Sequence, residues 1–204
     1  IATRAEAQIG GAVALEMLAE HHDQADAAII AAFGDPGLMG ARELFDIRVV
    51  GLAEAAMLAA CMLGRRFPIV TFARPLGPWY EECVAMHGLT GRCAGIRMLD
   101  ESFTDIADVQ AEKEDVIVTL AQRAVDEDAA DVVILAGAPL AGLAAKVAAR
   151  IPVPVVDQVR GALKLGGALG GVKPRRATAG SFRRPAPKPT QGLAAALAAR
   201  IEHH

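Results

Sequence analysis

Asp26-Ala-Ala-Ile-Ile-Ala-Ala-Phe-Gly-Asp-Pro-Gly-Leu38 is the stretch that decides the fold, and it has a counterpart at Asp131-Val-Val-Ile-Leu-Ala-Gly-Ala-Pro-Leu-Ala-Gly142. Each stretch begins with an acidic residue and continues with a short apolar run, a small-residue loop that carries a proline, and a helical pattern. A short apolar run that closes on Gly and Pro is typical of a buried parallel strand entering a tight turn. When the stretches are aligned on their acidic residues, Ala32 matches Gly137.

The segments that follow these two stretches also match. Ile47-Arg-Val-Val-Gly51 and Val153-Pro-Val-Val-Asp157 both read as short strands, and each leads into a helical pattern. The sequence therefore predicts an α/β fold with a duplicated unit. In open parallel sheets, ligands bind beyond the carboxyl ends of the strands. We expect one strand-end loop from each unit to face a shared cleft.

The chain resembles the aspartate/glutamate/hydantoin racemase superfamily, most closely its hydantoin and allantoin racemase branch. The similarity runs from about residue 5 to about residue 190, and the segment Gly34-Asp-Pro-Gly-Leu38 is its most specific part. The residues that carry it are Phe33-Gly-Asp-Pro-Gly-Leu38, Ala41-Arg-Glu43, Val50-Gly-Leu-Ala-Glu-Ala55, Ile69-Val-Thr71 and Val133-Ile-Leu-Ala-Gly-Ala-Pro-Leu-Ala141.

The resemblance implies two Rossmann-like parallel-sheet halves related by a pseudo-twofold axis, with the ligand cleft between them. Racemases of this superfamily place one cysteine at the end of a strand in each half, and the two thiols act as opposed bases. Those cysteines would fall at Ala32 and Gly137, where this chain has none. The resemblance therefore implies the fold and a small-molecule substrate, but not the two-thiol mechanism.

The predicted substrate-binding residues lie in the strand-end loops and in the elements that follow them. Thr71 ends an apolar strand, where its hydroxyl could donate a hydrogen bond to a carboxylate or imide oxygen. The resemblance implies a threonine there and often a second one after it, which Phe72 replaces. The full set is Ala32, Phe33, Gly34, Pro36, Thr71, Phe72, Tyr80, Gly137, Ala138 and Pro139.

Three carboxylates are candidates for proton transfer in place of the missing thiols: Asp35, Glu54 and Asp157. Each lies beside the end of a predicted strand, and burial that raises a carboxyl pKa would suit it for acid/base work. Each also lies where an acidic residue caps a helix or favours the helix dipole. Both interpretations remain open from the sequence.

Composition excludes several other classes of protein. The 204 residues are 53% hydrophobic and 4% aromatic and carry a net charge of −3, so nothing favours nucleic acid or an anionic membrane as a partner. No apolar run is long enough to span a bilayer. The three cysteines, Cys61, Cys83 and Cys93, are widely spaced and suggest reduced thiols in a cytoplasmic protein. No phosphate loop, dinucleotide fingerprint or metal-binding motif occurs, so we expect neither cofactor nor metal.

The sequence pattern predicts how the chain is divided into parts. Residues 1–72 and 131–172 form the pair of duplicated α/β elements, and residues 73–130 lie between them. Residues 173–204 form a basic, proline-rich arm with a terminal helix, which covers the domain or contacts another protomer of a homo-oligomer. The final Glu202-His-His204 resembles a purification-tag remnant. The chain starts at Ile1 within a helical pattern, and the resemblance implies an upstream segment with a further strand.

Three functions remain open from the sequence. The first is an isomerase that transfers a proton next to a carbonyl of an amino-acid-derived or hydantoin-type substrate through groups other than a cysteine pair. The second is a related lyase or decarboxylase. The third is a catalytically silent homologue that binds a small carboxylate or cyclic imide.

Overall fold

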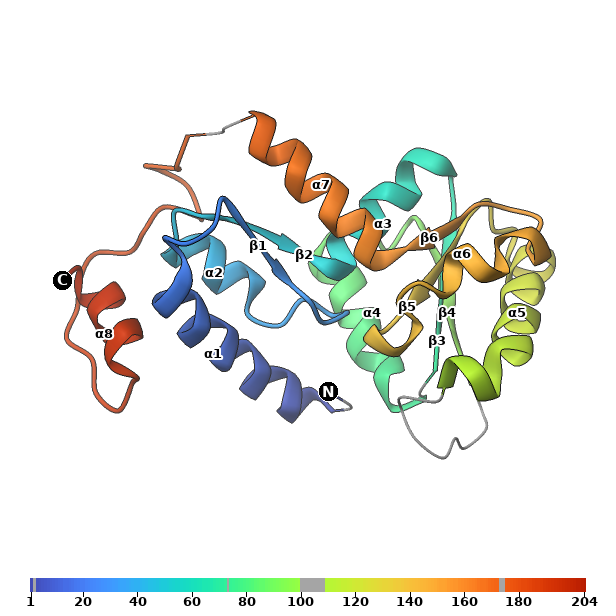
Figure 1. The fold of residues 1–204 in the computed structure, drawn as a ribbon, viewed down its shortest axis with the longest axis horizontal. Helices are drawn as coiled ribbons and strands as arrows, with labels where there is room; N and C mark the ends of the chain where they lie inside the picture. Colours follow the sequence, from blue (N-terminus) through green and yellow to red (C-terminus); the bar gives the residue numbers. More distant parts are fainter. Residues whose placement is uncertain (2, 73, 100–108, 173–174) are drawn as a thin grey trace.

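The computed structural model describes residues 1, 3–72, 74–99, 109–172 and 175–204. Figure 1 shows two lobes, each built on its own parallel sheet. The segment 100–108, predicted to be a loop, and the first two residues of the predicted arm lie outside the described part. No helix in the described ranges is both long and apolar enough to cross a membrane.

The first lobe contains a two-stranded parallel sheet. Its strands are β1 (Ala27–Ile30) and β2 (Arg48–Gly51), which pair in the register Ala28 to Val49. Three helices lie in this lobe or directly beside it: α1 (Arg4–His21), α2 (Leu38–Leu44) and α3 (Leu52–Leu63). A capping box in which Thr3 and Glu6 bond each other's backbone N–H groups starts α1.

The second lobe contains a four-stranded parallel sheet in the order β4-β3-β5-β6. Its elements are β3 (Phe67–Thr71), η1 (Arg74–Leu76), α4 (Gly77–Met86), β4 (Cys93–Met98), α5 (Val109–Asp128), β5 (Val133–Ala136), η3 (Ala138–Leu140), α6 (Leu143–Val147), η4 (Ala148–Arg150) and β6 (Val155–Asp157). The next helix, α7 (Gln158–Val172), leaves this sheet and packs against β1 and β2 of the first lobe. α5 contacts β3, β4 and β5, whereas α3 contacts β3, β5 and β6. β3 and β5 are buried at every position, as expected for central parallel strands covered on both faces.

The predicted duplication appears in the order of elements. β1, α2, β2 and α3 follow each other as β5, α6, β6 and α7 do. In both units the helix after the first strand begins at a glycine in the left-handed conformation, Gly37 with φ 78° and Gly142 with φ 81°. The α/β fold with two parallel sheets is thus confirmed, while the pseudo-twofold axis stays a prediction.

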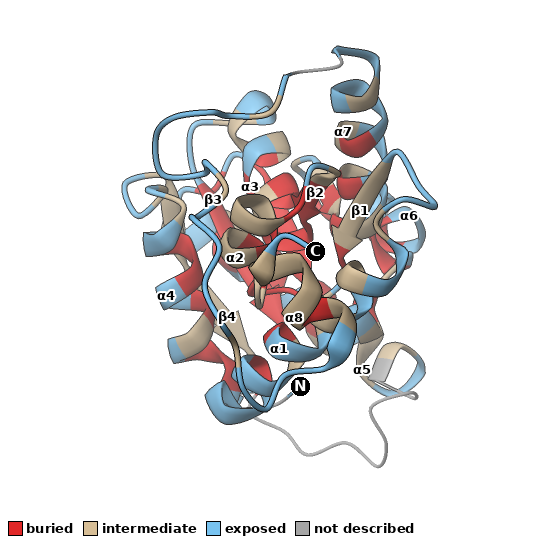
Figure 2. Ribbon diagram, turned by 90° about the vertical axis from the view of Figure 1, so that its left-hand side faces the viewer, coloured by how far each residue is buried: buried red, intermediate tan, exposed pale blue. Residues whose placement is uncertain are grey.

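The two sheets divide the chain between β2 and β3, and the predicted division into residues 1–72 with 131–172, 73–130 and 173–204 stays a prediction. β3 joins the second sheet because it pairs with β5, with Thr71 opposite Ala136. α3 bridges the lobes, since it packs against α7 and contacts strands of both sheets. The buried residues in Figure 2 lie mainly on the strands and on the helix faces turned toward them.

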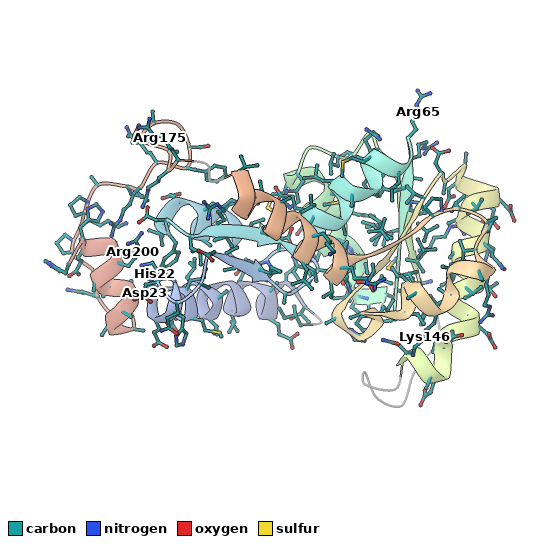
Figure 3. The ribbon with its side chains drawn as sticks, turned by 45° about the horizontal axis from the view of Figure 1, so that its top comes forward. His22, Asp23, Arg65, Lys146, Arg175 and Arg200 are labelled. Carbon is teal, nitrogen blue, oxygen red and sulfur yellow. The ribbon has the colours of Figure 1, made fainter. Side chains whose placement is uncertain are left out.

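The C-terminal segment packs against the first lobe. Arg200 and Arg176 both form ion pairs with Asp46 just after α2, and Arg200 also donates to the Leu44 carbonyl at 2.8 Å. Leu197 of α8 (Ala195–Glu202) is buried, and the Arg200 guanidinium lies 5.4 Å from the centre of the Phe45 ring. Figure 3 shows Arg200 close to His22 at this end of the molecule. The arm therefore covers the domain.

Candidate functional site

A cavity of about 350 Å³ lies where the carboxyl ends of β1, β3 and β5 meet the start of α4. Its walls are mostly apolar and aromatic. The lining residues are Ile1, Ala31, Ala32, Phe33, Phe72, Leu76, Trp79, Tyr80, Gly137, Ala138 and Pro139. Among these residues, only Trp79 and Tyr80 carry a side-chain N–H or O–H group, and none has an ionisable carboxylate, imidazole or thiol. The cavity thus suits a small, largely apolar ligand whose polar atoms meet backbone groups.

Two glycines allow aromatic rings to form the cavity walls. A Cβ on Gly34 would overlap with the indole of Trp79, and a Cβ on Gly137 would overlap with the ring of Phe72. Both glycines have positive φ, 115° at Gly34 and 106° at Gly137, which other residues rarely adopt. Phe72 therefore occupies the space that a side chain at position 137 would need.

Gln158, the first residue of α7, fixes the loop at Gly137. Its side-chain oxygen accepts a hydrogen bond from the Gly137 N–H at 3.0 Å, and its side-chain N–H donates to the Gly137 carbonyl. Gln158 is fully buried. A buried amide that satisfies both backbone groups of one residue holds that residue in a single conformation.

The hydroxyls nearest the cavity are engaged inside the protein. Thr71 is fully buried and donates to the Ala136 carbonyl at 3.0 Å. Burial raises the pKa of Tyr80, and its hydrogen bond with Thr71 acts in the opposite direction. Because the raised pKa keeps Tyr80 a neutral phenol, it can donate a hydrogen bond but is unsuited to accept a proton.

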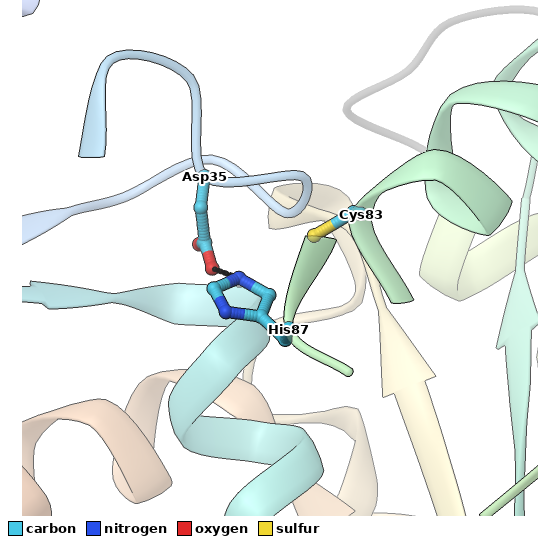
Figure 4. A group of neighbouring side chains, drawn as sticks. All are labelled: Asp35, Cys83 and His87. Atoms are coloured by element: carbon cyan, nitrogen blue, oxygen red, sulfur yellow. Dashed lines mark hydrogen bonds and ion pairs between the residues drawn. The ribbon is translucent and has the colours of Figure 1, made fainter. Parts of the chain in front are cut away.

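Asp35 lies behind the cavity wall in a buried cluster. Its side-chain oxygens accept hydrogen bonds from the backbone N–H groups of Ala53 and Glu54, both at 2.8 Å, and so cap α3. His87 Nε2 lies 3.0 Å from Asp35 Oδ2, and Cys83 lies close to both (Figure 4). The Asp35, Cys83 and His87 ligand atoms lie within 4.8 Å of one another, yet both Asp35 oxygens already have hydrogen-bond partners. The cluster is therefore a hydrogen-bonded support for the loop.

Glu54 and Asp157 also have structural partners. Arg42 forms a two-pronged ion pair with Glu54 and donates to the Val49 carbonyl at 3.0 Å. Asp157 accepts from the N–H groups of Gly142 at 2.8 Å and Arg160 at 2.9 Å. Neither carboxylate lines the cavity.

The structure brings together seven of the predicted binding residues and leaves the other predicted site residues outside. Ala32, Phe33, Phe72, Tyr80, Gly137, Ala138 and Pro139 line the cavity. Gly34 supports its wall and Thr71 lies beneath it. Pro36 faces a second cavity of about 440 Å³ between α1 and β1. Asp35, Glu54 and Asp157 are not at the cavity surface, because their oxygens are held by backbone N–H groups or by Arg42. Their acid/base role stays a prediction without geometric support.

Several residues of the site were not predicted from the sequence. Trp79, Leu76 and Ala31 line the cavity but were not among the predicted binding residues. Gln158 follows a predicted strand end directly, so its position was a usable signal. His87 had no such signal, because its partners Asp35 and Glu54 lie far away in the sequence.

The three cysteines lie away from the cavity lining. Burial raises the pKa of the Cys83 thiol, and the Asp35 and Glu54 carboxylates raise it further. Burial also raises the pKa of Cys93. The Cys83 and Cys93 thiols are therefore held protonated and are poor nucleophiles or bases. The structure offers no thiol in the described lining of the cavity to replace those absent at positions 32 and 137.

The fold and cavity define a parallel α/β protein whose small-molecule site lies between strand-end loops. The chain belongs to the Asp/Glu/hydantoin racemase family, whose family model matches residues 1–166. This membership confirms the predicted family of isomerases, and it implies a small-molecule substrate.

Individual proteins show the same relationship. The hydantoin racemase of Paenarthrobacter aurescens is 31% identical over 170 residues, which cover 83% of this chain and 72% of that protein. The hydantoin racemase of Pseudomonas sp. (strain NS671) is 37% identical over 142 residues, or 68% of this chain and 56% of that protein. The structure of allantoin racemase from Klebsiella pneumoniae superposes with a TM-score of 0.88 at 29% identity, covering 97% of this chain and 81% of that one. This chain thus spans part of the length of these relatives.

Proposed function

We propose that this protein is an isomerase that binds a hydantoin-type ring in the cavity between the Ala32 and Gly137 loops and exchanges the proton next to a ring carbonyl. The observation that supports this most is the position of the cavity. It lies at the ends of β1 and β5, where the resemblance implies the two catalytic cysteines, and it is walled by aromatic rings.

The chemistry must proceed without a thiol pair. Breaking the carbon–hydrogen bond leaves its electron pair in an enolate, which hydrogen-bond donors stabilise when they are aimed at the carbonyl oxygen. The described lining leaves backbone N–H groups and Trp79 for that task, and no described lining side chain can take the proton. A solvent base therefore accepts the proton, and solvent returns one to either face. Apolar walls limit the solvent in the cavity to the few molecules that exchange the proton, which strengthens the hydrogen bonds to the enolate.

A second candidate, a silent small-molecule binder, is favoured by one observation. None of the described lining residues carries a side chain that could act as a general base. A cavity of this kind can bind a cyclic imide without accelerating any reaction. Both candidates predict that the cavity binds a cyclic imide, but only the isomerase predicts accelerated exchange of its α-proton.

Proton NMR in heavy water separates the candidates. The protein is incubated with allantoin, 5-methylhydantoin, 5-benzylhydantoin, aspartate and glutamate, and loss of the α-proton signal is compared with buffer alone. The isomerase predicts exchange of a hydantoin about 10²-fold above buffer, the contribution typical of one enolate-stabilising donor. The variant Ala138→Phe, which fills the cavity, removes this exchange, whereas C61S/C93S retains it.

Binding without exchange on any of these compounds selects the silent binder. Exchange that persists in the A138F variant contradicts the placement of the site. Loss of exchange in C61S/C93S contradicts the thiol-free mechanism, because it assigns proton transfer to a cysteine outside the cavity.

A further inference from the structure

The loop after β1 contacts α4 through three consecutive residues. The ring of Phe33 lies 4.8 Å from the ring of Tyr80, centre to centre, and the Gly34 backbone lies against the indole of Trp79. Asp35 bonds His87 at the end of the helix. We propose that Asp35 and His87 are positioning residues that hold this loop against α4 and thereby fix the two facing walls of the cavity.

The Asp35–His87 contact is buried and is linked to two further elements, α2 and α3. The side chain of Asp35 is fully buried, and that of His87 is 3% exposed. The other ring nitrogen of His87, Nδ1, lies 3.6 Å from Glu54 Oε1, and Glu54 is paired with Arg42 of α2. A buried network in which every polar group has a partner allows few alternative arrangements. One chain of contacts thus joins α2, the start of α3, the β1 loop and α4.

The backbone around Asp35 has features that place its carboxylate in this buried position. Asp35 itself has φ 52°, a left-handed conformation that is uncommon for a residue other than glycine. Gly51 at the end of β2 leaves room for its carboxylate, because a Cβ on Gly51 would overlap with Asp35 Oδ2. An uncommon backbone conformation persists where surrounding contacts fix it. These contacts are the two α3 N–H groups and His87.

The consequence for the site follows from the geometry of α4. Trp79 and Tyr80 lie in its first turns and line the cavity, while His87 lies at its other end. Contacts at both ends of the helix prevent it from tilting away from Phe33 and Gly34. The core packing of α4 and the Asp35 bonds to α3 remain when the His87 contact is lost, but the described direct link between the β1 loop and α4 is then reduced to the aromatic contacts, so the cavity widens. This inference deepens the proposed function, but its first test needs no ligand.

Trp79 is the only tryptophan in the chain, so its fluorescence reports the wall directly. The variants are H87L, which removes the contact, and H87Q, whose amide N–H can replace His87 Nε2. The matched control is R97M, which breaks the Arg97–Asp128 pair on the far side of the second sheet. We expect H87L to raise the acrylamide quenching constant of Trp79 about twofold, as local opening does. H87Q and R97M leave it near the wild-type value.

Two outcomes overturn the proposal. One is an unchanged quenching constant in folded H87L, and the other is an equal rise in R97M, which would mark a general loss of stability. If H87L does not fold, H87N is used, because its side chain is too short to reach Asp35. Titration of 5-benzylhydantoin adds a second readout: H87L weakens binding and H87Q restores it. A protein that binds no hydantoin contradicts the proposed function while leaving the Trp79 result as the test of the positioning.

Discussion

Single glycines decide whether the site can form. Gly51 is the clearest case, since a Cβ there would overlap with the buried carboxylate of Asp35. We predict that Gly51→Ala lowers the free energy of unfolding by about 2 kcal/mol, the typical cost of overpacking a well-packed site. The matched control is Gly167→Ala within α7, where a Cβ meets no atom within 4 Å. Because alanine is the better helix former, the control is neutral or stabilising. Urea unfolding measures both, and equal effects would contradict the account.

Cysteine reactivity is a second property of single residues. Burial and two nearby carboxylates raise the pKa of Cys83, so its reactive thiolate is scarce at neutral pH. We predict that iodoacetamide at pH 8 modifies the half-buried Cys61 well before Cys83 in the folded protein, as peptide mass spectrometry can show. In denaturant, Cys61 and Cys83 are expected to react at similar rates. Rapid labelling of native Cys83 would show that the cluster around Asp35 is open to solvent.

At the scale of elements, the strands that carry the site were predictable. The apolar runs before Gly34 and Gly137 predicted β1 and β5, and the glycines and prolines predicted where they end. The partners of those loops were not predictable, because they come from distant segments. Gln158 bonds Gly137 across 21 residues of sequence, and His87 bonds Asp35 across 52. Local patterns also could not show which helix a carboxylate caps. Asp35 caps α3 and not the helix that directly follows it in the sequence.

The same limit applies to α1. Ile9, Val13 and Met17 recur at helical spacing, which is typical of a buried helix face, yet they are exposed by 65%, 46% and 58%. Leu15 and Leu18 pack against the first lobe as expected. Periodicity identified the helix but could not tell which apolar residues the neighbouring elements cover.

The strand-end elements β3 and β5 are coupled through Phe72 and Gly137. We predict that Gly137→Cys lowers the free energy of unfolding by about 3 kcal/mol, through overlap with Phe72 and a strained positive φ. In an F72T background, Gly137→Cys lowers the free energy of unfolding by less. The overlap with the Phe72 ring is then gone, and only the backbone strain remains. A double-mutant cycle measured by urea unfolding reports this coupling. Strict additivity would mean that the Phe72 ring does not limit position 137.

This coupling also predicts how thiol chemistry could be introduced. The variant A32C/G137C retains the ring of Phe72 against the second thiol, whereas A32C/F72T/G137C has space for it. We predict faster α-proton exchange on hydantoins in the triple variant than in the double variant, measured by proton NMR in heavy water. The A32C/F72T variant, with one thiol, is the control. A triple variant no faster than this control would contradict the assignment of positions 32 and 137 to opposite faces of the ligand.

At the scale of the whole molecule, the C-terminal arm folds back on the first lobe through few contacts. Asp46 receives both Arg176 and Arg200, although it is largely exposed. We predict that Asp46→Ala loosens the arm and increases cleavage by trypsin after Arg183 several-fold, because proteolysis tracks local opening. Asp126→Ala in α5 is the control, and an unchanged cleavage rate in D46A would show that the Asp46 ion pairs do not hold the arm. The homo-oligomer stays a prediction.

The central claim is that the cavity between the strand-end loops is the ligand site, although a larger cavity lies between α1 and β1. Isothermal titration with 5-benzylhydantoin tests this most directly, using one alanine-to-phenylalanine change in each cavity. Ala138 lines only the cavity at the strand ends, and Ala14 lines only the cavity beside α1. The account predicts that A138F abolishes binding and that A14F leaves it unchanged. Binding that survives A138F and is lost in A14F would contradict it.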